Sequence, residues 1–271
     1  MPLTPPIVLT IAGFDPSSGA GVTADIKTIA AHECYGLACI TALTVQSTLG
    51  VSRVVPVDAE IVAETLNELV ADMPIAAIRI GMLGSGNAAR AVAGFIRQNG
   101  PPNVVLDPIL KSSSGAKLLD DTGKELLLKE LLPLARVVTP NLDEASSLAG
   151  LPVTNLEEMK AAAGCLHLMG AHAVVITGGH LDDPTDLLSV ATSDGISIQP
   201  FTSAKQHTAS THGTGCAFAT SLTCHLALGA EIPEAVQRAN SYVHQSIRNA
   251  YPVGRGIGPV NHLWNLKQVS G

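Results

Sequence analysis

The chain has 271 residues, of which 46% are apolar and only 3% aromatic. A chain of this length and composition can bury the core of one large α/β domain, and it does not suit an all-β protein. The formal net charge of −7 at pH 7 argues against a nucleic-acid partner, because proteins that bind nucleic acids usually present a basic surface.

Short apolar segments alternate along the chain with longer segments of helical pattern, as strands and helices do in α/β folds. The short segments carry branched apolar residues throughout, as strands buried on both faces of a sheet must. Strands are predicted at residues 7–12, 38–45, 76–80, 104–106, 136–138 and 173–176, followed by a hairpin of residues 187–191 and 196–200. Helices are predicted at residues 23–31, 59–71, 88–98, 142–148, 156–169, 216–228 and 233–249. The pattern predicts one doubly wound domain over residues 1–271, in which helices cover both faces of a central, mostly parallel sheet.

The first candidate binding loop follows the first predicted strand, since ligands of such sheets bind beyond the carboxyl ends of the strands. Residues 13–21 read Gly-Phe-Asp-Pro-Ser-Ser-Gly-Ala-Gly, and Asp25 lies one turn into the next helix. The dinucleotide pattern Gly-x-Gly-x-x-Gly is absent from this loop and the Walker pattern from the whole chain, so ATP would have to bind in another way. Taken alone, such a loop is more often only a tight turn, with Asp25 solvated.

A second glycine-rich segment, Thr211-His212-Gly213-Thr214-Gly215-Cys216, precedes an alanine-rich helix. Glycines at this position leave backbone N–H groups free at the positive end of the helix dipole, where a phosphate can bind. Cys216 lies at the helix N-terminus, where the pKa of a thiol tends to be lowered, so it is a candidate base for a substrate hydroxyl. An N-cap Thr followed by a small buried thiol is an equally compatible interpretation.

Three further segments end predicted strands on the same rim of the sheet: Asp107, then Asn141 with Glu144, then Gly178-Gly179-His180. Asn141 and Glu144 are three residues apart, so they share a helix face and could hold hydrated Mg²⁺ beside ATP phosphates. The same pair also fits an N-terminal capping box, which these two residues alone favour. His180 in a glycine-rich loop is more often a solvent-facing side chain than a phosphate ligand.

The five cysteines are scattered through apolar segments and include no Cys-x-x-Cys pair, so reduced thiols are expected. No apolar run is long enough to span a bilayer, and the N-terminus lacks a basic segment followed by an apolar one. These features predict a soluble cytoplasmic protein without a membrane partner.

Eight motifs in a consistent order, spread over nearly the whole chain, carry a family resemblance. They are Thr10-Ile11-Ala12-Gly13 with Gly19-Ala20-Gly21 and Ala24-Asp25; Ile40-Thr41-Ala42-Leu43-Thr44-Val45-Gln46; Ile80-Gly81-Met82-Leu83; Val105-Leu106-Asp107-Pro108; Thr139-Pro140-Asn141 with Glu144; Gly178-Gly179-His180; Thr211 to Cys216; and Gly256-Ile257-Gly258-Pro259-Val260. Together they resemble the ribokinase superfamily, and within it the bacterial hydroxymethylpyrimidine/phosphomethylpyrimidine kinases of thiamin biosynthesis. Most sugar kinases of that superfamily have Asp where Cys216 stands, so this residue favours a pyrimidine or pyridoxal substrate.

The resemblance implies a single-domain ribokinase-like α/β fold, usually assembled as a homodimer. It also implies a kinase that uses ATP and Mg²⁺ to phosphorylate 4-amino-5-hydroxymethyl-2-methylpyrimidine and then its monophosphate, giving the diphosphate. Two alternatives remain open. One is a pyridoxal or pyridoxine kinase, whose substrate also carries a hydroxymethyl group on an aromatic nitrogen heterocycle. The other is a catalytically silent pyrimidine-binding protein.

The resemblance assigns site residues on three sides of the reacting groups. A Gln in the substrate pocket suits an aminopyrimidine, because its carboxamide can donate and accept at once. The small-molecule substrate is expected between Gly13, Asp25, Gln46 and Met82, and the anion hole is expected at Gly213, Thr214 and Gly215, with Cys216 as the base. The nucleotide side is expected at Asp107, Asn141, Glu144, Thr177 and Gly179, with Mg²⁺ held through water by Asn141 and Glu144.

Thr177 departs from the family pattern, because close relatives often carry at that position a Lys that reaches the ATP phosphates. The absence of this Lys is expected to weaken ATP binding or slow turnover unless another cation compensates. Lys111 is a candidate for that role, although a loop Lys is more often solvated.

Overall fold

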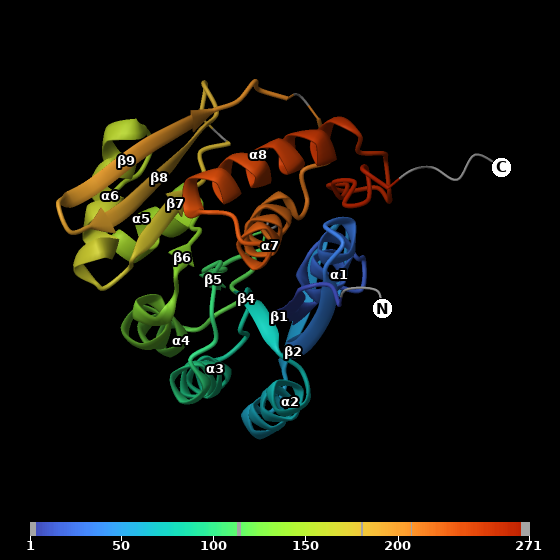
Figure 1. Ribbon diagram of the computed structural model, residues 1–271. Helices are drawn as coiled ribbons and strands as arrows, with labels where there is room; N and C mark the ends of the chain where they lie inside the picture. The colour runs from blue at the N-terminus through green and yellow to red at the C-terminus, as the bar shows by residue number, and fades with distance from the viewer. Residues whose placement is uncertain (1–3, 113–114, 180, 207, 267–271) are drawn as a thin grey trace.

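One sheet is the scaffold on which the loops of the chain are placed (Figure 1). The structure is a computed structural model that describes residues 4–112, 115–179, 181–206 and 208–266. The described strands follow the order β3-β2-β1-β4-β5-β6-β7-β8-β9. They are β1 (Ile7–Phe14), β2 (Tyr35–Ser47), β3 (Gly50–Pro56), β4 (Ile75–Ile80), β5 (Val104–Leu106), β6 (Val137–Val138), β7 (Ala173–Ile176), β8 (Thr185–Thr192) and β9 (Gly195–Thr202). The helices are α1 (Gly21–Ala31), α2 (Ala59–Asp72), α3 (Gly86–Asn99), α4 (Asp121–Leu126), α5 (Leu142–Ala149), α6 (Leu156–Leu168), α7 (Thr214–Ala227) and α8 (Ile232–Arg248), with a π-helical turn η1 (Leu127–Leu131) and a 3₁₀ turn η2 (Leu132–Leu134) after α4.

The centre of the sheet is parallel and its two ends are antiparallel. β1 pairs in parallel with β2 on one side and with β4 on the other, and parallel pairing continues from β4 to β7. β3 at one end and β8 with β9 at the other add the antiparallel strands. The strand order therefore reverses at β1, and ligands of α/β sheets bind beyond the carboxyl ends of the strands at such a point. The predicted fold class is confirmed.

Side chains of the central strands alternate between two hydrophobic cores, because successive residues of a strand point to opposite faces. In β5, Val104 and Leu106 belong to the core that includes residues of α2, α3, α5 and α6. Val105 belongs to the core built with α7 and α8. Figure 1 shows α7 and α8 above the sheet in this view and α2, α3 and α4 below it. Since helices cover both faces, the loops at the strand ends are left to form the site.

Two parts of the structure are missing from the sequence-based prediction. β3 is an exposed or half-exposed partner of β2 and has no alternation of buried and exposed residues that a pattern could reveal. The helical segment from α4 to η2 begins at Asp120, which accepts a hydrogen bond from the N–H of Gly123. This N-cap followed by a leucine-rich run is a helix signal that the sequence does contain.

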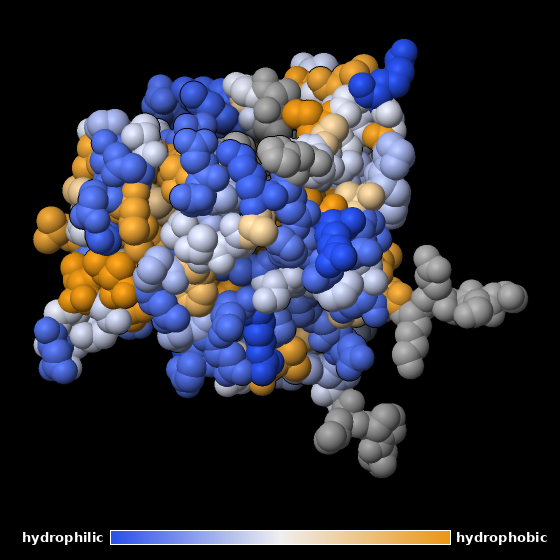
Figure 2. Space-filling model, turned by 90° about the horizontal axis from the view of Figure 1, so that it is seen from above, coloured by the Kyte–Doolittle hydropathy of each residue, from blue (hydrophilic) through white to orange (hydrophobic). Residues whose placement is uncertain are grey.

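The surface mixes hydrophilic and hydrophobic residues. In Figure 2, apolar residues gather on the left, on the side where β8 and β9 lie in Figure 1. β9 is the outermost strand there, and its Ile196 and Ile198 are about half exposed. None of the helices in the described part of the chain has the length and apolar character needed to cross a membrane.

Candidate active site

Helix α7 begins without a side-chain cap. Its N-cap is Gly213, and no side chain in the described ranges accepts a hydrogen bond from the first turn. Asp58, Ser85 and Asn155 cap α2, α3 and α6 with their side chains, whereas α1 and α8, like α7, begin without a side-chain cap. The N–H of Thr214 makes a long bond, 3.4 Å, to Thr211 O, and within the described residues no hydrogen bond of the Gly215 and Cys216 N–H groups is seen, so the start of α7 can receive an anion.

Gly213 also fixes the position of these amides, the N–H groups of residues 213–216, which we call the anion cradle. Its φ is 84°, in the left-handed region, and a Cβ at this position would lie only 1.9 Å from the carbonyl oxygen of Gly19. Only glycine permits this close approach, which packs the first glycine-rich loop against the start of α7. The two glycine-rich segments recognised separately in the sequence therefore form one site.

Cys216 stands in the first turn of α7 and is 7% exposed. The sequence predicts a lowered pKa for this thiol, and that prediction is wrong for this structure. Burial raises the pKa of Cys216 to about 12, although the nearby charge of Arg79 and a hydrogen bond from the backbone N–H of Gly21 act in the opposite direction. The loss of hydration outweighs the helix dipole, so the group is a thiol at neutral pH. All five cysteines of the chain are free.

Three of the residues predicted to contact the substrate come from neighbouring strands. Gly13 lies in β1, Gln46 lies in β2, and Met82 follows β4. Gly13 and Met82 are adjacent, since a Cβ on Gly13 would lie 2.8 Å from Met82 Sδ. Gln46, near the end of β2, lines a cavity of about 140 Å³ together with His212. His212, which directly precedes the anion cradle, thus shares a cavity with Gln46, the residue expected to recognise the pyrimidine.

His212 determines what Gln46 can still bind. His212 Nε2 lies 2.9 Å from Asp15 Oδ2 and 3.4 Å from Gln46 Nε2. Although burial acts to raise the pKa of Asp15, hydrogen bonds from His212 and Ser17 lower it, so the carboxylate is charged and His212 Nε2 carries the hydrogen. An Nε2 that carries the hydrogen for Asp15 cannot accept from Gln46, so His212 does not satisfy the N–H groups of Gln46.

Asp25 is the exception among the predicted substrate residues. It has no exposed surface. Thr10 Oγ1 and Thr220 Oγ1 donate to its carboxylate at 2.6 and 2.7 Å, and Arg79 Nη1 donates at 3.0 Å. With its oxygens occupied and its surface covered, Asp25 does not line the substrate cavity. The prediction of direct substrate contact is corrected: Asp25 is a residue of α1, and its carboxylate lies beneath the site, bonded to side chains of β1, β4 and α7.

The predicted nucleotide side lies at the ends of β5, β6 and β7. Asn141 and Thr177 pair as an isolated bridge, and the N–H of Thr177 donates to Pro140 O at 2.9 Å. Gly179 follows β7 and is exposed. Asp107 is close enough to the anion cradle for its charge to raise the pKa of the Cys216 thiol. These residues, Asp107, Asn141, Thr177 and Gly179, therefore occupy one rim that adjoins the start of α7, which we call the nucleotide rim.

Asn141 and Glu144 form a capping box, which is the alternative interpretation of this pair. Glu144 N–H donates to Asn141 Oδ1 at 2.9 Å, and Asn141 N–H donates to Glu144 Oε2 at 3.0 Å. The oxygens used in these two bonds are not available as direct metal ligands. Within the described ranges, no group of three or more His, Cys, Asp and Glu side chains is placed to hold a metal ion.

The carboxyl groups of this rim nevertheless fit a cation carried by a nucleotide. Burial and the charge of Asp107 raise the pKa of Glu144 to about 8. Burial also raises the pKa of Asp107 to about 6, against the effect of Arg79. A divalent cation would relieve this repulsion between like charges, and oxygen ligands are those that Mg²⁺ prefers, often through water.

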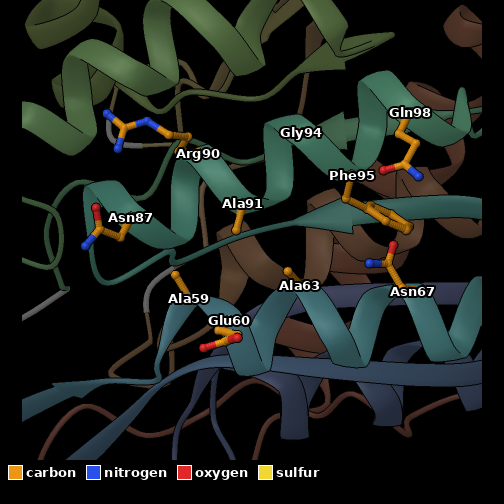
Figure 3. A pocket seen from close by; sticks show the side chains of 10 residues that line it. All are labelled: Ala59, Glu60, Ala63, Asn67, Asn87, Arg90, Ala91, Gly94, Phe95 and Gln98. Atoms are coloured by element: carbon orange, nitrogen blue, oxygen red, sulfur yellow. The ribbon is translucent and has the colours of Figure 1, made fainter.

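A larger cavity of about 480 Å³ lies elsewhere, between α2 and α3 (Figure 3). Its walls include Glu60 and Asn67 of α2 and Arg90 and Phe95 of α3. No predicted site residue is among those that line it. The larger cavity therefore lies apart from the predicted site.

Sequence and fold are both shared with known proteins. A family model described as phosphomethylpyrimidine kinase matches residues 15–261. The chain belongs to this family. A thiamine biosynthesis bifunctional protein of Geobacter sulfurreducens is 41% identical over 264 residues, which cover 97% of this chain but only 53% of that protein, so the chain spans about half of its length. A hydroxymethylpyrimidine/phosphomethylpyrimidine kinase of Streptomyces coelicolor is 38% identical over 266 residues, covering 98% of this chain and 97% of the relative.

Two solved structures extend the similarity of this phosphomethylpyrimidine kinase family member to three dimensions. A phosphomethylpyrimidine kinase from Clostridium difficile is 34% identical with a TM-score of 0.77, and the match covers 89% of this chain and 99% of that one. The pyridoxal kinase from Staphylococcus aureus in complex with ADP is 33% identical with a TM-score of 0.88, covering 97% and 96%. The fold is therefore shared by kinases named for two related substrates.

Lys111 lies in the loop that follows β5, and Lys205 lies in the segment that follows β9. Lys111 is exposed and pairs with Lys117 in an isolated bridge. Lys205 Nζ lies 3.6 Å from Asp182 Oδ1, in the segment that follows Gly179. Compensation for the Thr177 position by Lys111 stays a prediction. His180 lies outside the described residues.

Arg79 and His212 are functional candidates to which the sequence pattern assigns no role. Arg79 is a charged residue inside the apolar strand Ile75–Ile80, and a charge in such a place needs a buried partner. This charge within an apolar strand is the feature of the sequence that indicates a special role for Arg79. His212 stands within a recognised motif, but its partner Asp15 is 197 residues away in the sequence, and only the folded chain brings them together.

Proposed function

We propose that this protein is an ATP-dependent kinase that phosphorylates 4-amino-5-hydroxymethyl-2-methylpyrimidine and then its monophosphate, in thiamin biosynthesis. The name of the Streptomyces coelicolor relative, which matches over almost its whole length, supports this substrate class. The observation that carries the proposal is the uncapped N-terminus of α7 with Cys216 in its first turn. Free amides at a helix N-terminus bind phosphate, and a neighbouring sulfur can take the proton of an alcohol.

The substrate side of the proposed reaction uses the loops after β1, β2 and β4. The pyrimidine lies between Gly13 and Met82, where the thioether offers adaptable apolar contact. The carboxamide of Gln46 donates to a ring nitrogen and accepts from the exocyclic amine. In this pose the hydroxymethyl group faces Cys216, whose deprotonated form removes the hydroxyl proton.

The phosphate side uses the head of α7 and the nucleotide rim. The amides of Gly213, Thr214, Gly215 and Cys216 bind the oxygens of the transferred phosphoryl group, on which charge is stabilised in the transition state. Asn141 and Glu144 would hold Mg²⁺ through water at the rim, where the cation would supply positive charge beside the phosphates. The nucleotide is proposed to lie along Asp107, Asn141, Glu144, Thr177 and Gly179.

The proposed substrate preference is tested against pyridoxal, which is the second candidate because of the fold shared with the Staphylococcus aureus pyridoxal kinase. We expect kcat/KM to be higher for the hydroxymethylpyrimidine by roughly 10-fold or more, because a site that hydrogen-bonds an amine discriminates against a ligand that lacks it. The measurement is coupled ADP release with each alcohol in turn. A higher kcat/KM for pyridoxal would reverse the assignment, and pyrimidine binding without ADP release would indicate a silent sensor.

We further propose that the chain forms a single domain and that two copies form a homodimer. The proposed compartment is the cytoplasm, which supplies ATP and keeps thiols reduced. Apolar side chains on one face of β2 and β3 support the dimer: Leu43, Val45 and Val55 are 49%, 58% and 40% exposed. We expect light scattering after gel filtration to give the mass of a dimer, and Val45→Asp to shift it towards the monomer. Ile61→Asp, at an exposed apolar position on α2, is the control. A wild-type protein of monomer mass would refute this part of the proposal.

A further inference from the structure

Arg79 places a positive charge inside the sheet, directly below the site. Its side chain is completely buried and comes from β4. Nη1 lies 3.0 Å from Asp25 Oδ2, and Nη2 lies 2.5 Å from Asp107 Oδ2. The guanidinium needs the space left by Gly81, where a Cβ would lie 1.9 Å from Nη1. One cation therefore bridges two carboxylates from different parts of the chain.

The two carboxylates belong to segments on opposite sides of the proposed site. Asp25 belongs to α1 and accepts a hydrogen bond from Thr220 of α7, one turn beyond Cys216. Asp107 directly follows β5 on the nucleotide rim. Through these contacts, Arg79 connects the helix that carries the anion cradle with the edge of the sheet proposed to bind the nucleotide.

The charges of this cluster are unequal. Asp25 and Asp107 face a single guanidinium, and its Nε has no hydrogen-bond partner in the described part of the chain. Arg79 acts on both sides of the site, since its charge opposes the effect of burial on Asp107 and on Cys216. A planar guanidinium can bond two carboxylates at once in a fixed geometry, which the ammonium of a lysine cannot reproduce.

We infer that Arg79 is a positioning residue for phosphoryl transfer, which holds the Thr220–Asp25 contact under α7 and Asp107 at the nucleotide rim in one rigid arrangement. Arg79 touches neither substrate and acts through these two carboxylates. The inference rests on the proposed anion cradle of α7 and adds the residue that keeps this cradle in register with the nucleotide. Small errors in such register cost a large part of the rate, because phosphoryl transfer depends mainly on positioning.

The test uses two variants and a matched control for each. Arg79→Lys keeps the charge but loses the bridge, and Arg97→Lys makes the same change in the surface pair of Arg97 with Glu130. Thr220→Val removes the link from α7 to Asp25. Thr223→Val removes an equally buried hydroxyl of the same helix, which donates to the backbone oxygen of Ala219 and has no other bond among the described residues. Steady-state kinetics with the pyrimidine and Mg-ATP are measured beside thermal unfolding.

We expect Arg79→Lys to lower kcat by roughly 10-fold or more and Thr220→Val to lower it several-fold, with both KM values within about 2-fold of the wild type. The two control variants keep kcat and KM. Lower thermal stability of Arg79→Lys with unchanged kcat would show a purely structural role and overturn the inference. If Arg79→Lys does not fold, the comparison of the two threonine variants decides, and equal kcat values for them overturn it. Loss of activity in Cys216→Ala together with full activity in Arg79→Lys would leave the proposed function standing and remove only this inference.

Discussion

Cys216→Ala is expected to lower kcat by roughly 10²-fold or more while leaving both KM values nearly unchanged, because it removes the proposed base without removing a binding contact. The sulfur lies in the first turn of α7, beside the free amides and within the field of Arg79 and Asp107. Initial rates of ADP release at saturating substrates measure the effect. Cys224→Ala is the matched control, since this thiol belongs to the same helix but packs in an apolar cluster with Val8 and Ile29.

The pH dependence of the reaction tests the same assignment. The deprotonated sulfur is the active form, and burial raises its pKa to about 12, so its population increases with pH throughout the range below that value. We expect kcat of the wild type to rise by about 10-fold per pH unit above neutrality until another step limits turnover, and the rise to be absent in Cys216→Ala. Cys216→Asp, which supplies a carboxylate in place of the thiol, should recover part of the lost rate. Unchanged kcat in Cys216→Ala would remove Cys216 from the mechanism.

Gly213→Ala is expected to reduce kcat by at least roughly 10²-fold, since the change displaces the amides that stabilise the transferred phosphoryl group. The new methyl group would start 1.9 Å from Gly19 O, which is part of the backbone and cannot move alone. The first glycine-rich loop and the start of α7 must therefore separate. Activity, the KM for Mg-ATP and thermal unfolding are measured together, and we expect all three to worsen.

Gly229→Ala separates this clash from the cost of the backbone conformation. Gly229 lies just beyond the other end of α7 with a φ of 89°, and a Cβ there meets nothing within 4 Å. It therefore shares the strain of a left-handed residue, roughly 1–2 kcal/mol, without the collision. We expect a modest loss of thermal stability and nearly full kcat. Equal kcat values for Gly213→Ala and Gly229→Ala would show that the cradle at Gly213 does not contribute to catalysis.

Much of the fold and the location of the site could be predicted from the sequence. The branched apolar strands reveal their burial, and Asp107, Asn141 and Gly179 each follow such a strand, so the rules of parallel sheets place them on one rim. The glycines of the two loops are also informative, because backbone groups that approach as closely as Gly213 and Gly19 exclude side chains. Patterns that reflect periodicity or steric exclusion are thus readable without a structure.

The rest depends on how far each group is buried and on partners distant in sequence. The position of Cys216 at a helix N-terminus suggests a low pKa, but its depth below the surface, which reverses the shift, is set by tertiary packing. Asp25 reads as a substrate residue until Thr220 and Arg79 are seen to occupy its carboxylate. Asn141 and Glu144 fit two interpretations from spacing alone, and only their geometry shows the capping box.

The most direct test of the central claim is to incubate the protein with Mg-ATP and the hydroxymethylpyrimidine and to weigh the products by mass spectrometry. We expect a product heavier by one phosphoryl group, then one heavier by two, with one ADP formed for each phosphoryl group transferred, and we expect Cys216→Ala to yield far less of both products. Recovery of the unmodified pyrimidine from a wild-type protein that binds it would contradict the claim that the head of α7 transfers phosphate.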